Sequence, residues 1–255
     1  GFNADSRKPC DSVSLLRYRL DALIICGSDV CAPWLKSFLA KDIPIAQIGS
    51  DVNYPGVDRV EMDEAYGIGL LADFVVATGH RRIGFIGNSC GPHRRRRKIL
   101  EDALAARGIG PEQTVMVLAP EGKNSGLEAM SSLLQQAGKC LPDVVLAADD
   151  SMAQGGLRAL HNAGMNVPRD ISLTGIDDIP AAELMIPALT TIRAPIDRMV
   201  RAAFALVFDT SAQNPFRVMQ FEPELMVRES CTSPERHNEV INPKRLKNHR
   251  EGDRS

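Results

Sequence analysis

Short apolar runs alternate with longer amphipathic stretches along most of the chain. Six runs have the length of a strand and are rich in Val and Ile; they cover residues 20–26, 43–49, 81–87, 114–119, 142–148 and 170–176. Such runs are typical of parallel strands that are buried on both faces. Three segments between them have helical periodicity and end at a glycine, as helices commonly do: 67–78, 94–107 and 152–163. The repeated alternation predicts βαβ crossovers and an α/β fold with parallel sheets.

The pattern changes toward the C-terminus. We expect a short extended piece at 189–193, a helix over 195–208 with Pro195 at its start, and two short strands at 217–221 and 225–228. Residues 231–255 are polar, charged and poor in apolar side chains, so we expect them to form a disordered tail. Residues 1–7 are interpreted as the end of a strand whose beginning is absent.

Composition excludes several classes of protein. The chain of 255 residues has a formal net charge of −2, which gives it no overall attraction to DNA or to acidic membranes. No apolar run approaches the roughly 18–20 residues that span a bilayer, and the first ten residues lack the apolar core of a signal peptide. The six cysteines are scattered without a CxxC pair, which favours reduced thiols over a disulfide framework or a zinc site. These features predict a cytoplasmic protein without metal or cofactor.

The search for catalytic motifs finds none. GxSxG, HExxH, P-loop and kinase signatures are absent, so no catalytic residue is proposed. Gly67-Ile-Gly69-Leu-Leu-Ala72 matches the dinucleotide pattern GxGxxA, which requires the glycines to form a strand-to-helix turn. Here the turn is expected earlier, near residues 63–65. We therefore interpret these glycines as small residues inside a helix that packs closely against its neighbours.

A basic run and three carboxylate-bearing turns are the remaining polar features. The run His93–Lys98 could contact nucleic acid, but it opens an amphipathic helix and has no interleaved aromatics. Most of it is expected to be a solvated face, with one arginine pointing into a cleft. The turns follow extended segments, where ligands bind in open parallel sheets, although Asp150 and Asp178 could equally be helix N-caps. The turns are Met62-Asp63-Glu64, Ala148-Asp149-Asp150 and Gly175-Ile176-Asp177-Asp178.

Four motifs together resemble the lactose-repressor (LacI/GalR) family of bacterial transcriptional regulators. VEMDEAYGIGLLADFVVATGHRRIGFIG, ending at Gly87, resembles an Asp, a Gly-containing helix and "GH-R-R-I-x-F-I-G" in that family. Residues 142–168 resemble "PDAVFAANDxMAxGALRALxxAGxxVP", and residues 170–195 resemble "DVSVxGFDDxPxAxxxxPxLTTxRQP". Residues 223–230, PELMVRES, resemble the terminal strand. The motifs occur in family order, and we take the resemblance that they carry to extend over nearly everything from residue 1 to 230.

The resemblance implies a two-lobed fold like that of periplasmic binding proteins of type I, each lobe a parallel sheet flanked by helices. Residues 1–79 and 193–221 would form the first lobe, without its first strand and helix. Residues 80–192 and 222–230 would form the second. The resemblance also implies a small-molecule effector in the cleft, a sugar or sugar derivative, and a homodimer. Operator DNA would be bound only through a helix-turn-helix, which this sequence does not contain.

By motif position, the resemblance implies five effector-contacting residues. Arg96 matches the arginine of the helix after "FIG", Asp149 stands at the Asn of "ND", and Asp177 at the Asp of "GFD". Tyr66 and Glu121 fall where other members place pocket residues. Guanidinium and carboxylate groups suit hydroxyl-rich or charged ligands.

The sequence departs from the family pattern in ways that leave the effector unnamed. Ile99 replaces the glycine of "R-x-x-G-[FYW]", Glu121 stands where an aromatic often stacks on the effector, and Asp149 adds a charge that Arg96 opposes. The preferred interpretation is an effector-sensing module and not an enzyme. The alternatives are a periplasmic sugar-binding protein of a transport system and a remnant without function.

Overall fold

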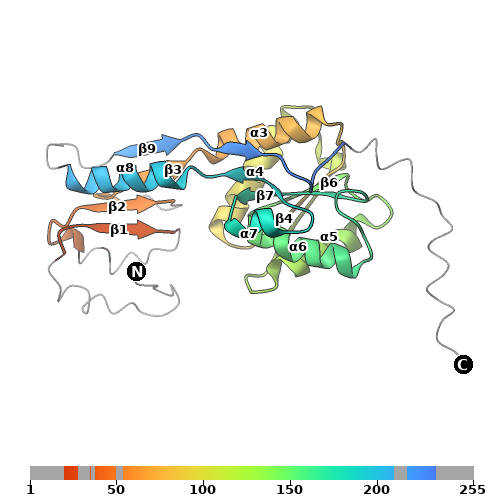
Figure 1. Ribbon diagram of the computed structural model, residues 1–255, viewed down its shortest axis with the longest axis horizontal. Helices are drawn as coiled ribbons and strands as arrows, with labels where there is room; N and C mark the ends of the chain where they lie inside the picture. The colour runs from red at the N-terminus through yellow and green to blue at the C-terminus, as the bar shows by residue number, and fades with distance from the viewer. Residues whose placement is uncertain (1–19, 28–34, 36–37, 50–53, 210–216, 234–255) are drawn as a thin grey trace, which may run out of the picture.

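Two α/β lobes lie side by side in the computed structural model (Figure 1). The structure describes residues 20–27, 35, 38–49, 54–209 and 217–233. The expected strand remnant at residues 1–7 and the expected tail from residue 234 onward lie outside the described residues. No helix among the described residues is long and apolar enough to cross a membrane.

The first lobe is built on a parallel sheet of four strands, ordered β1-β2-β3-β9. One face of the sheet is covered by α8, which turns apolar side chains such as Met199 and Leu206 onto Ala46 and Val60. A second cluster around Phe38 packs near β1 and β2. The elements are β1 (Leu23–Cys26), β2 (Ile45–Ile48), β3 (Asp58–Met62), α8 (Ile196–Phe208) and β9 (Val218–Phe221).

The second lobe has a sheet of six strands, ordered β10-β8-β7-β6-β4-β5, which is parallel except for β10. Its strands are β4 (Ile83–Asn88), β5 (Thr114–Ala119), β6 (Val144–Ala147), β7 (Ser172–Asp177), β8 (Thr190–Arg193) and β10 (Glu224–Met226). Its helices are α3 (Glu64–Ala77), α4 (Gly91–Ala105), α5 (Ser125–Ala137), α6 (Asp150–Asn162) and α7 (Pro180–Leu184), with the short 3-10 turn η1 (Pro111–Gln113). Apolar side chains from both faces form one continuous core.

The predicted α/β fold with flanked parallel sheets is confirmed. Each strand expected within the described residues overlaps a strand of the structure, because continuous apolar runs of this length are stable only when they are covered on both faces. Gly67 lies inside α3, as expected, and packs against Pro223 and Ile192, where a Cβ would lie only 2.7 Å from Pro223 Cγ. The sequence pattern did not single out α5 or α7.

The lobe boundary near residue 80 differs from the expectation. Residues 64–79 were assigned to the first lobe, but α3 packs on the second (Figure 1). Ile68, Leu71 and Val75 are buried in the core of the six-stranded sheet, and α3 contacts α4, β8 and β10. The chain therefore leaves the first lobe at Asp63, because the apolar face of α3 is complementary to the larger sheet. It returns after Arg193 and leaves again after Phe221.

The start of the expected tail is also ordered. Cys231 is buried in the core of the second lobe, and the backbone N–H of Thr232 donates to the hydroxyl of Ser172. Ser230 bonds Leu173 and Thr190, so the segment 230–232 closes one end of the sheet. Because the composition is polar from residue 232 onward, nothing in the sequence indicates that residues 230–232 pack against the sheet. Cys231 and the other described cysteines, Cys26, Cys90 and Cys140, are free thiols.

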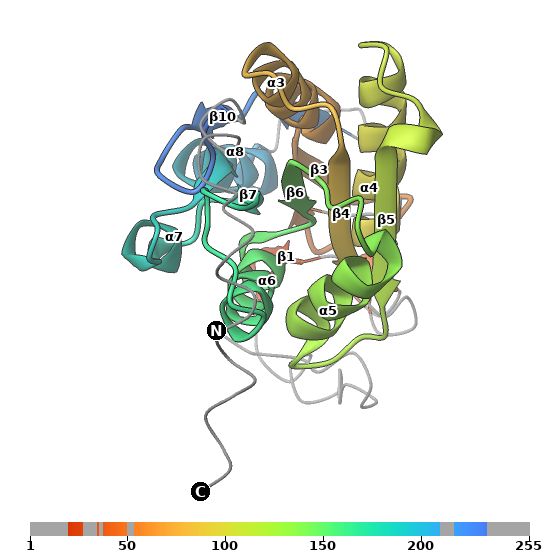
Figure 2. The same ribbon diagram turned by 90° about the vertical axis from the view of Figure 1, so that its right-hand side faces the viewer.

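Helices α5 and α6 approach each other unusually closely (Figure 2). The contact is made by Gly126 of α5 and Gly155 of α6, whose backbones touch without any side chain between them. A Cβ at Gly126 would lie 2.5 Å from the carbonyl oxygen of Met152, and one at Gly155 would lie 2.7 Å from the amide nitrogen of Leu127. Only glycine fits at these two positions without moving backbone.

Candidate functional site

A cavity of about 700 Å³ lies between the two lobes. Its wall is formed where strands of both sheets end, by residues such as Ile48 and Met62 of the first lobe and Asp177 of the second. The carboxyl ends of parallel strands are the usual ligand-binding edge of such sheets. The volume falls within the range of small-molecule pockets, which is roughly 300–1,000 Å³.

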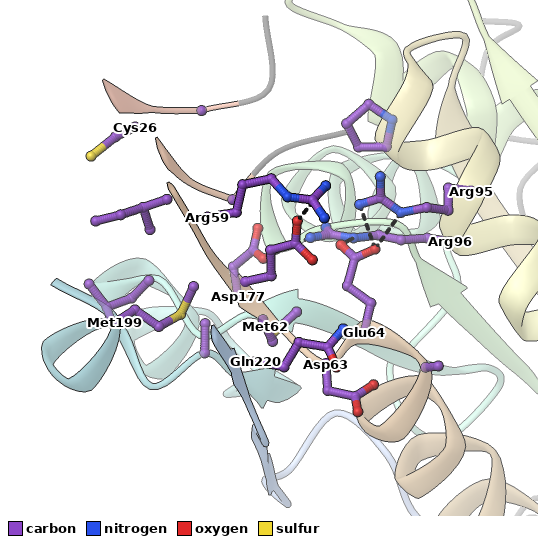
Figure 3. A pocket seen from close by; sticks show the side chains of 18 of the residues that line it. Cys26, Arg59, Met62, Asp63, Glu64, Arg95, Arg96, Asp177, Met199 and Gln220 are labelled. Carbon is purple, nitrogen blue, oxygen red and sulfur yellow. Dashed lines mark hydrogen bonds and ion pairs between the residues drawn. The ribbon is translucent and has the colours of Figure 1, made fainter. Parts of the chain in front are cut away.

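Glu64 lies at the centre of the charged residues that line the cavity. Asp63 caps α3 by accepting from the backbone N–H of Tyr66, and this places Glu64 in the first turn of the helix, facing α4. Glu64 Oε1 accepts from Nε of Arg96 at 2.8 Å, and Oε2 accepts from Nε and Nη2 of Arg95 at 2.9 and 2.7 Å (Figure 3). One carboxylate therefore holds two guanidinium groups, and it ties α3 to α4.

Arg96 is almost buried and makes three contacts. Besides Glu64, its Nη1 donates to the carbonyl oxygen of Ala148 at 2.7 Å and its Nη2 donates to Asp177 Oδ1 at 3.3 Å. Burial acts to lower the pKa of Arg96, but the carboxylates of Asp177 and Glu64 outweigh it and hold the pKa above its usual value. Arg96 thus remains charged and links the ends of β6 and β7 to α3.

Asp177 ends β7 at the cavity. Burial raises the pKa of its carboxyl to about 6, although the guanidinium of Arg96 opposes this, and the nearby charges of Asp149 and Glu64 add to the rise. The backbone of Asp177 has φ of 110°, a conformation that side chains other than glycine rarely adopt. Positive φ at a polar residue beside a cavity is typical of a functional position.

The first lobe contributes a second ion pair and an apolar surface. On β3, Arg59 Nη1 lies 3.3 Å from Glu61 Oε1, and both side chains are about one-fifth exposed. Apolar residues from both lobes complete the wall: Ile48, Met62, Ile99, Ile196, Met199 and Val200. The cavity therefore combines a charged side with a side suited to the nonpolar face of a ligand.

Of the five residues singled out in the sequence, Arg96 and Asp177 line the cavity. Tyr66 and Glu121 do not line it, and both are exposed. Asp149 also is not one of the residues that line the cavity. The described residues contain no group of three or more His, Cys, Asp or Glu side chains that could hold a metal ion.

Asp149 is engaged in a structural pair with His93. The backbone N–H of Asn88 donates to Nδ1 of His93, so the ring carries its proton on Nε2 and donates to Asp149 Oδ2 at 2.9 Å. Asp149 Oδ1 caps α6 by accepting from the N–H of Met152. Burial acts to raise the pKa of Asp149, but these hydrogen bonds outweigh it and leave the pKa below its usual value. Asp149 thus fixes the start of α4, the helix that carries Arg96.

Asp150, interpreted in the sequence as a possible N-cap, has a different role. Asp149 caps α6, whereas Asp150 is fully buried and accepts from the hydroxyl of Thr191 at 2.6 Å and from the N–H of Ile179 at 2.9 Å. Burial raises the pKa of Asp150 to about 6 despite these two bonds. Its side chain lies directly against Gly175 on β7, where a Cβ would clash with the carboxylate. This contact joins α6, β7 and β8.

Asp178 is bound at one of the crossings between the lobes. Its carboxylate accepts from Nε of Arg193, the last residue of β8, at 2.6 Å and from Nη1 of Arg228 at 2.7 Å. Burial acts to raise the pKa of Asp178, but the two arginines outweigh it and lower the pKa. Asp178 is therefore an ion-pair partner at the hinge and not the cap of a helix.

Sequence reasoning found part of this site and missed the rest. The turn at residues 62–64 and the basic run were both noted, but only Arg96 was expected to face the cleft, whereas Arg95 lines it as well. Glu64 was not selected because its importance depends on the docking of α3 onto α4. Arg59 and Glu61 carry no sequence signal, since a charged pair within a strand is also common on exposed sheets.

Comparison with known proteins identifies similar chains. A family model described as a periplasmic binding protein-like domain matches residues 72–231. The HTH-type transcriptional regulator GalR of Salmonella typhimurium is 30% identical over 243 residues, which are 92% of this chain and 69% of GalR. These two matches cover both lobes.

Solved structures give the same result. A LacI transcriptional regulator from a Rhodococcus species is 28% identical, with a TM-score of 0.75 over 87% of this chain and 82% of that one. A LacI family transcriptional regulator from Enterococcus faecium, crystallised with bound ribose, has a TM-score of 0.77 at 24% identity and covers 86% of this chain and 82% of its own. The second of these establishes the likeness of fold alone.

Proposed function

The chain belongs to the LacI/GalR family of transcriptional regulators, and from this premise we propose that it senses a small-molecule effector in the cavity between its lobes. The single observation that carries the assignment of the site is the cluster of Glu64, Arg96 and Asp177, which joins three elements around that cavity. We propose Arg96 and Asp177 as effector contacts, together with Glu64.

The effector would act by holding the two lobes in one relative orientation. A ligand in the cavity touches β3 of the first lobe and α4 and β7 of the second, so it stabilises whichever lobe arrangement lets it make all these contacts. In a regulator with paired subunits, that arrangement biases how the DNA-binding segments fit an operator. Operator contact itself would belong to a helix-turn-helix, for which residues 1–255 contain no motif, and control of an operator implies a cytoplasmic location.

The alternatives raised by the sequence are not favoured. The relatives are transcriptional regulators, which are neither enzymes nor transport-system binding proteins. A remnant without function is not favoured either, because both lobes have packed apolar cores beside the cavity.

Thermal unfolding of the purified chain against a panel of sugars, sugar acids, sugar phosphates, polyols and nucleobases tests this function. A ligand present at about 100 times its Kd should add roughly 2.7 kcal/mol and raise Tm by several degrees. The shift should be lost in Arg96→Gln and Asp177→Asn and kept in Arg97→Gln, whose partly exposed side chain pairs with Glu101 outside the cavity. A shift that persists in the first two variants would contradict the proposed site.

We further infer a homodimer with contacts from both lobes. Leu184 and Ile186 of the second lobe are 81% and 90% exposed, and Phe204 and Phe208 on α8 of the first lobe are also exposed. Apolar residues this exposed are typical of a surface that is covered by another chain. Sedimentation should detect a dimer at micromolar concentrations, and Leu184→Asp with Ile186→Asp should weaken it. A monomer at every micromolar concentration of the unaltered chain would contradict the inference.

A further inference from the structure

Three guanidinium groups from the two lobes extend toward the same part of the cavity (Figure 3). Arg59 comes from β3 of the first lobe, whereas Arg95 and Arg96 come from the first turns of α4 in the second. Like charges that face each other across a gap repel, and the repulsion is larger where the groups are partly removed from water. The arrangement therefore favours negative charge between the lobes.

The carboxylates of this wall already have partners. Glu64 is shared by Arg95 and Arg96, and Glu61 binds Arg59 by one long contact of 3.3 Å. Asp63 accepts from the helix backbone and points away from the arginines (Figure 3). A neutral sugar hydroxyl can accept from the guanidinium groups, but its own proton would have to share a carboxylate that already has a partner, whereas an oxyanion only accepts.

Asp177 changes the charge balance of the cluster. Because burial raises its pKa to about 6, its carboxyl takes up a proton within reach of neutral pH. With Asp177 protonated, the three arginines of the wall are balanced by three carboxylates, Glu61, Asp63 and Glu64. Because Asp63 points away from the arginines (Figure 3), only Glu61 and Glu64 offset them locally. A bound anion would itself favour this protonated state.

We propose that the effector carries an oxyanion, a carboxylate or a phosphate, which binds between Arg59 of the first lobe and Arg95 and Arg96 of the second. The proposal rests on the proposed function, and it adds the chemical class of the ligand. Guanidinium groups bind such anions through paired, charge-assisted hydrogen bonds that are stronger than those to a neutral hydroxyl.

The same geometry gives the anion a direct role in lobe closure. An oxyanion that bonds Arg59 and Arg95 together connects β3 of the first lobe to α4 of the second. The rest of the ligand would lie against the apolar residues Met62, Met199 and Val200. The charged end thus joins the lobes, and the nonpolar end selects for shape.

Matched ligand pairs test the proposal on the full chain. We would measure Kd by calorimetry and Tm by thermal unfolding for D-glucose against D-glucuronate and D-glucose 6-phosphate, and for inorganic phosphate against chloride, all at equal ionic strength. The anionic members should bind about tenfold or more tightly than the neutral sugar, as expected for hydrogen bonds to a charged group. Arg59→Gln should remove this preference, and Arg201→Gln, an exposed arginine of the same lobe, should keep it.

Each outcome separates this inference from the broader function. Tighter binding of glucuronate alone assigns a carboxylate, and tighter binding of the phosphates alone assigns a phosphate; both support the proposal. Glucose that binds as tightly as its anionic partners overturns the oxyanion class and leaves the sensing function intact. A preference for anions that survives in Arg59→Gln overturns the placement between the lobes. No binding by any of these sugars, acids or phosphates overturns this proposal, and the wider panel then decides the function.

Discussion

Replacing Gly126 with alanine should lower the free energy of unfolding by about 3 kcal/mol, at the upper end of what overpacking costs. A Cβ there would lie 2.5 Å from the carbonyl oxygen and 3.0 Å from the Cα of Met152. Both are backbone atoms of α6, so no side-chain rotation relieves the clash and the two helices must separate. Separation of α5 from α6 would open the core around Met130 and Met152, where both helices pack on the sheet.

Thermal or urea unfolding measures this effect as a fall in Tm of roughly 6–12 °C for a chain of this size. Gly122→Ala is the matched control, since nothing lies within 4 Å of its Cβ position and its effect should be below about 0.5 kcal/mol. The sign of the change in the free energy of unfolding is informative, because alanine in place of glycine within a helix normally stabilises a protein by about 0.5–1 kcal/mol. A Tm at or above that of the unaltered chain would show that the helices are not held at this contact.

Arg96→Ala is expected to be the second most damaging change, with a loss of about 3 kcal/mol at neutral pH. The substitution removes the partner of Asp177 and one of the two partners of Glu64 while leaving both carboxylates in place. The loss should grow with pH. Burial and neighbouring carboxylates already raise the pKa of Asp177 to about 6, and Arg96 is the group that restrains it. Without Arg96, the pKa of Asp177 rises further.

The sign follows from proton linkage. An acid whose folded-state pKa lies above its unfolded value contributes stability below the unfolded pKa, and it loses that contribution as pH rises through the folded pKa. The difference between Arg96→Ala and the unaltered chain should therefore be larger at pH 8 than at pH 5. Urea unfolding of both proteins at pH 5 and at pH 8 measures this difference in the free energy of unfolding. Arg97→Ala, which breaks only an exposed pair with Glu101, should cost about 0.5 kcal/mol at both.

The fold was predictable from the sequence because its determinants are local. Apolar runs of strand length and helices that end at glycine specify a chain in which strands and helices alternate. Only a few layered arrangements can bury such elements. The lobe to which α3 belongs was not predictable in this way. The sequence shows that α3 has an apolar face but not which sheet that face covers, and only the packed structure places Leu71 and Val75 on the larger one.

The site was predictable only where a motif marks it. Arg96 and Asp177 stand at motif positions and line the cavity, whereas Asp149 stands at a motif position and does not line it; its carboxylate is hydrogen-bonded to His93 of α4. The motif does not indicate that His93, 56 residues earlier in the chain, pairs with Asp149. Glu64 and Arg59 depend on which surfaces meet across the cleft, and a single sequence contains no signal of such long-range pairing.

The turn after β7 places two consecutive carboxylates in different surroundings. Asp177 faces the cavity and Asp178 holds the arginines at the crossing between the lobes, and both have positive φ, 110° and 54°. Because a planar peptide bond joins the two residues, a displacement of Asp177 would also move Asp178. The ion pairs that Asp178 makes with Arg193 and Arg228 would then have to adjust, so a change at the cavity would be felt at the crossing between the lobes.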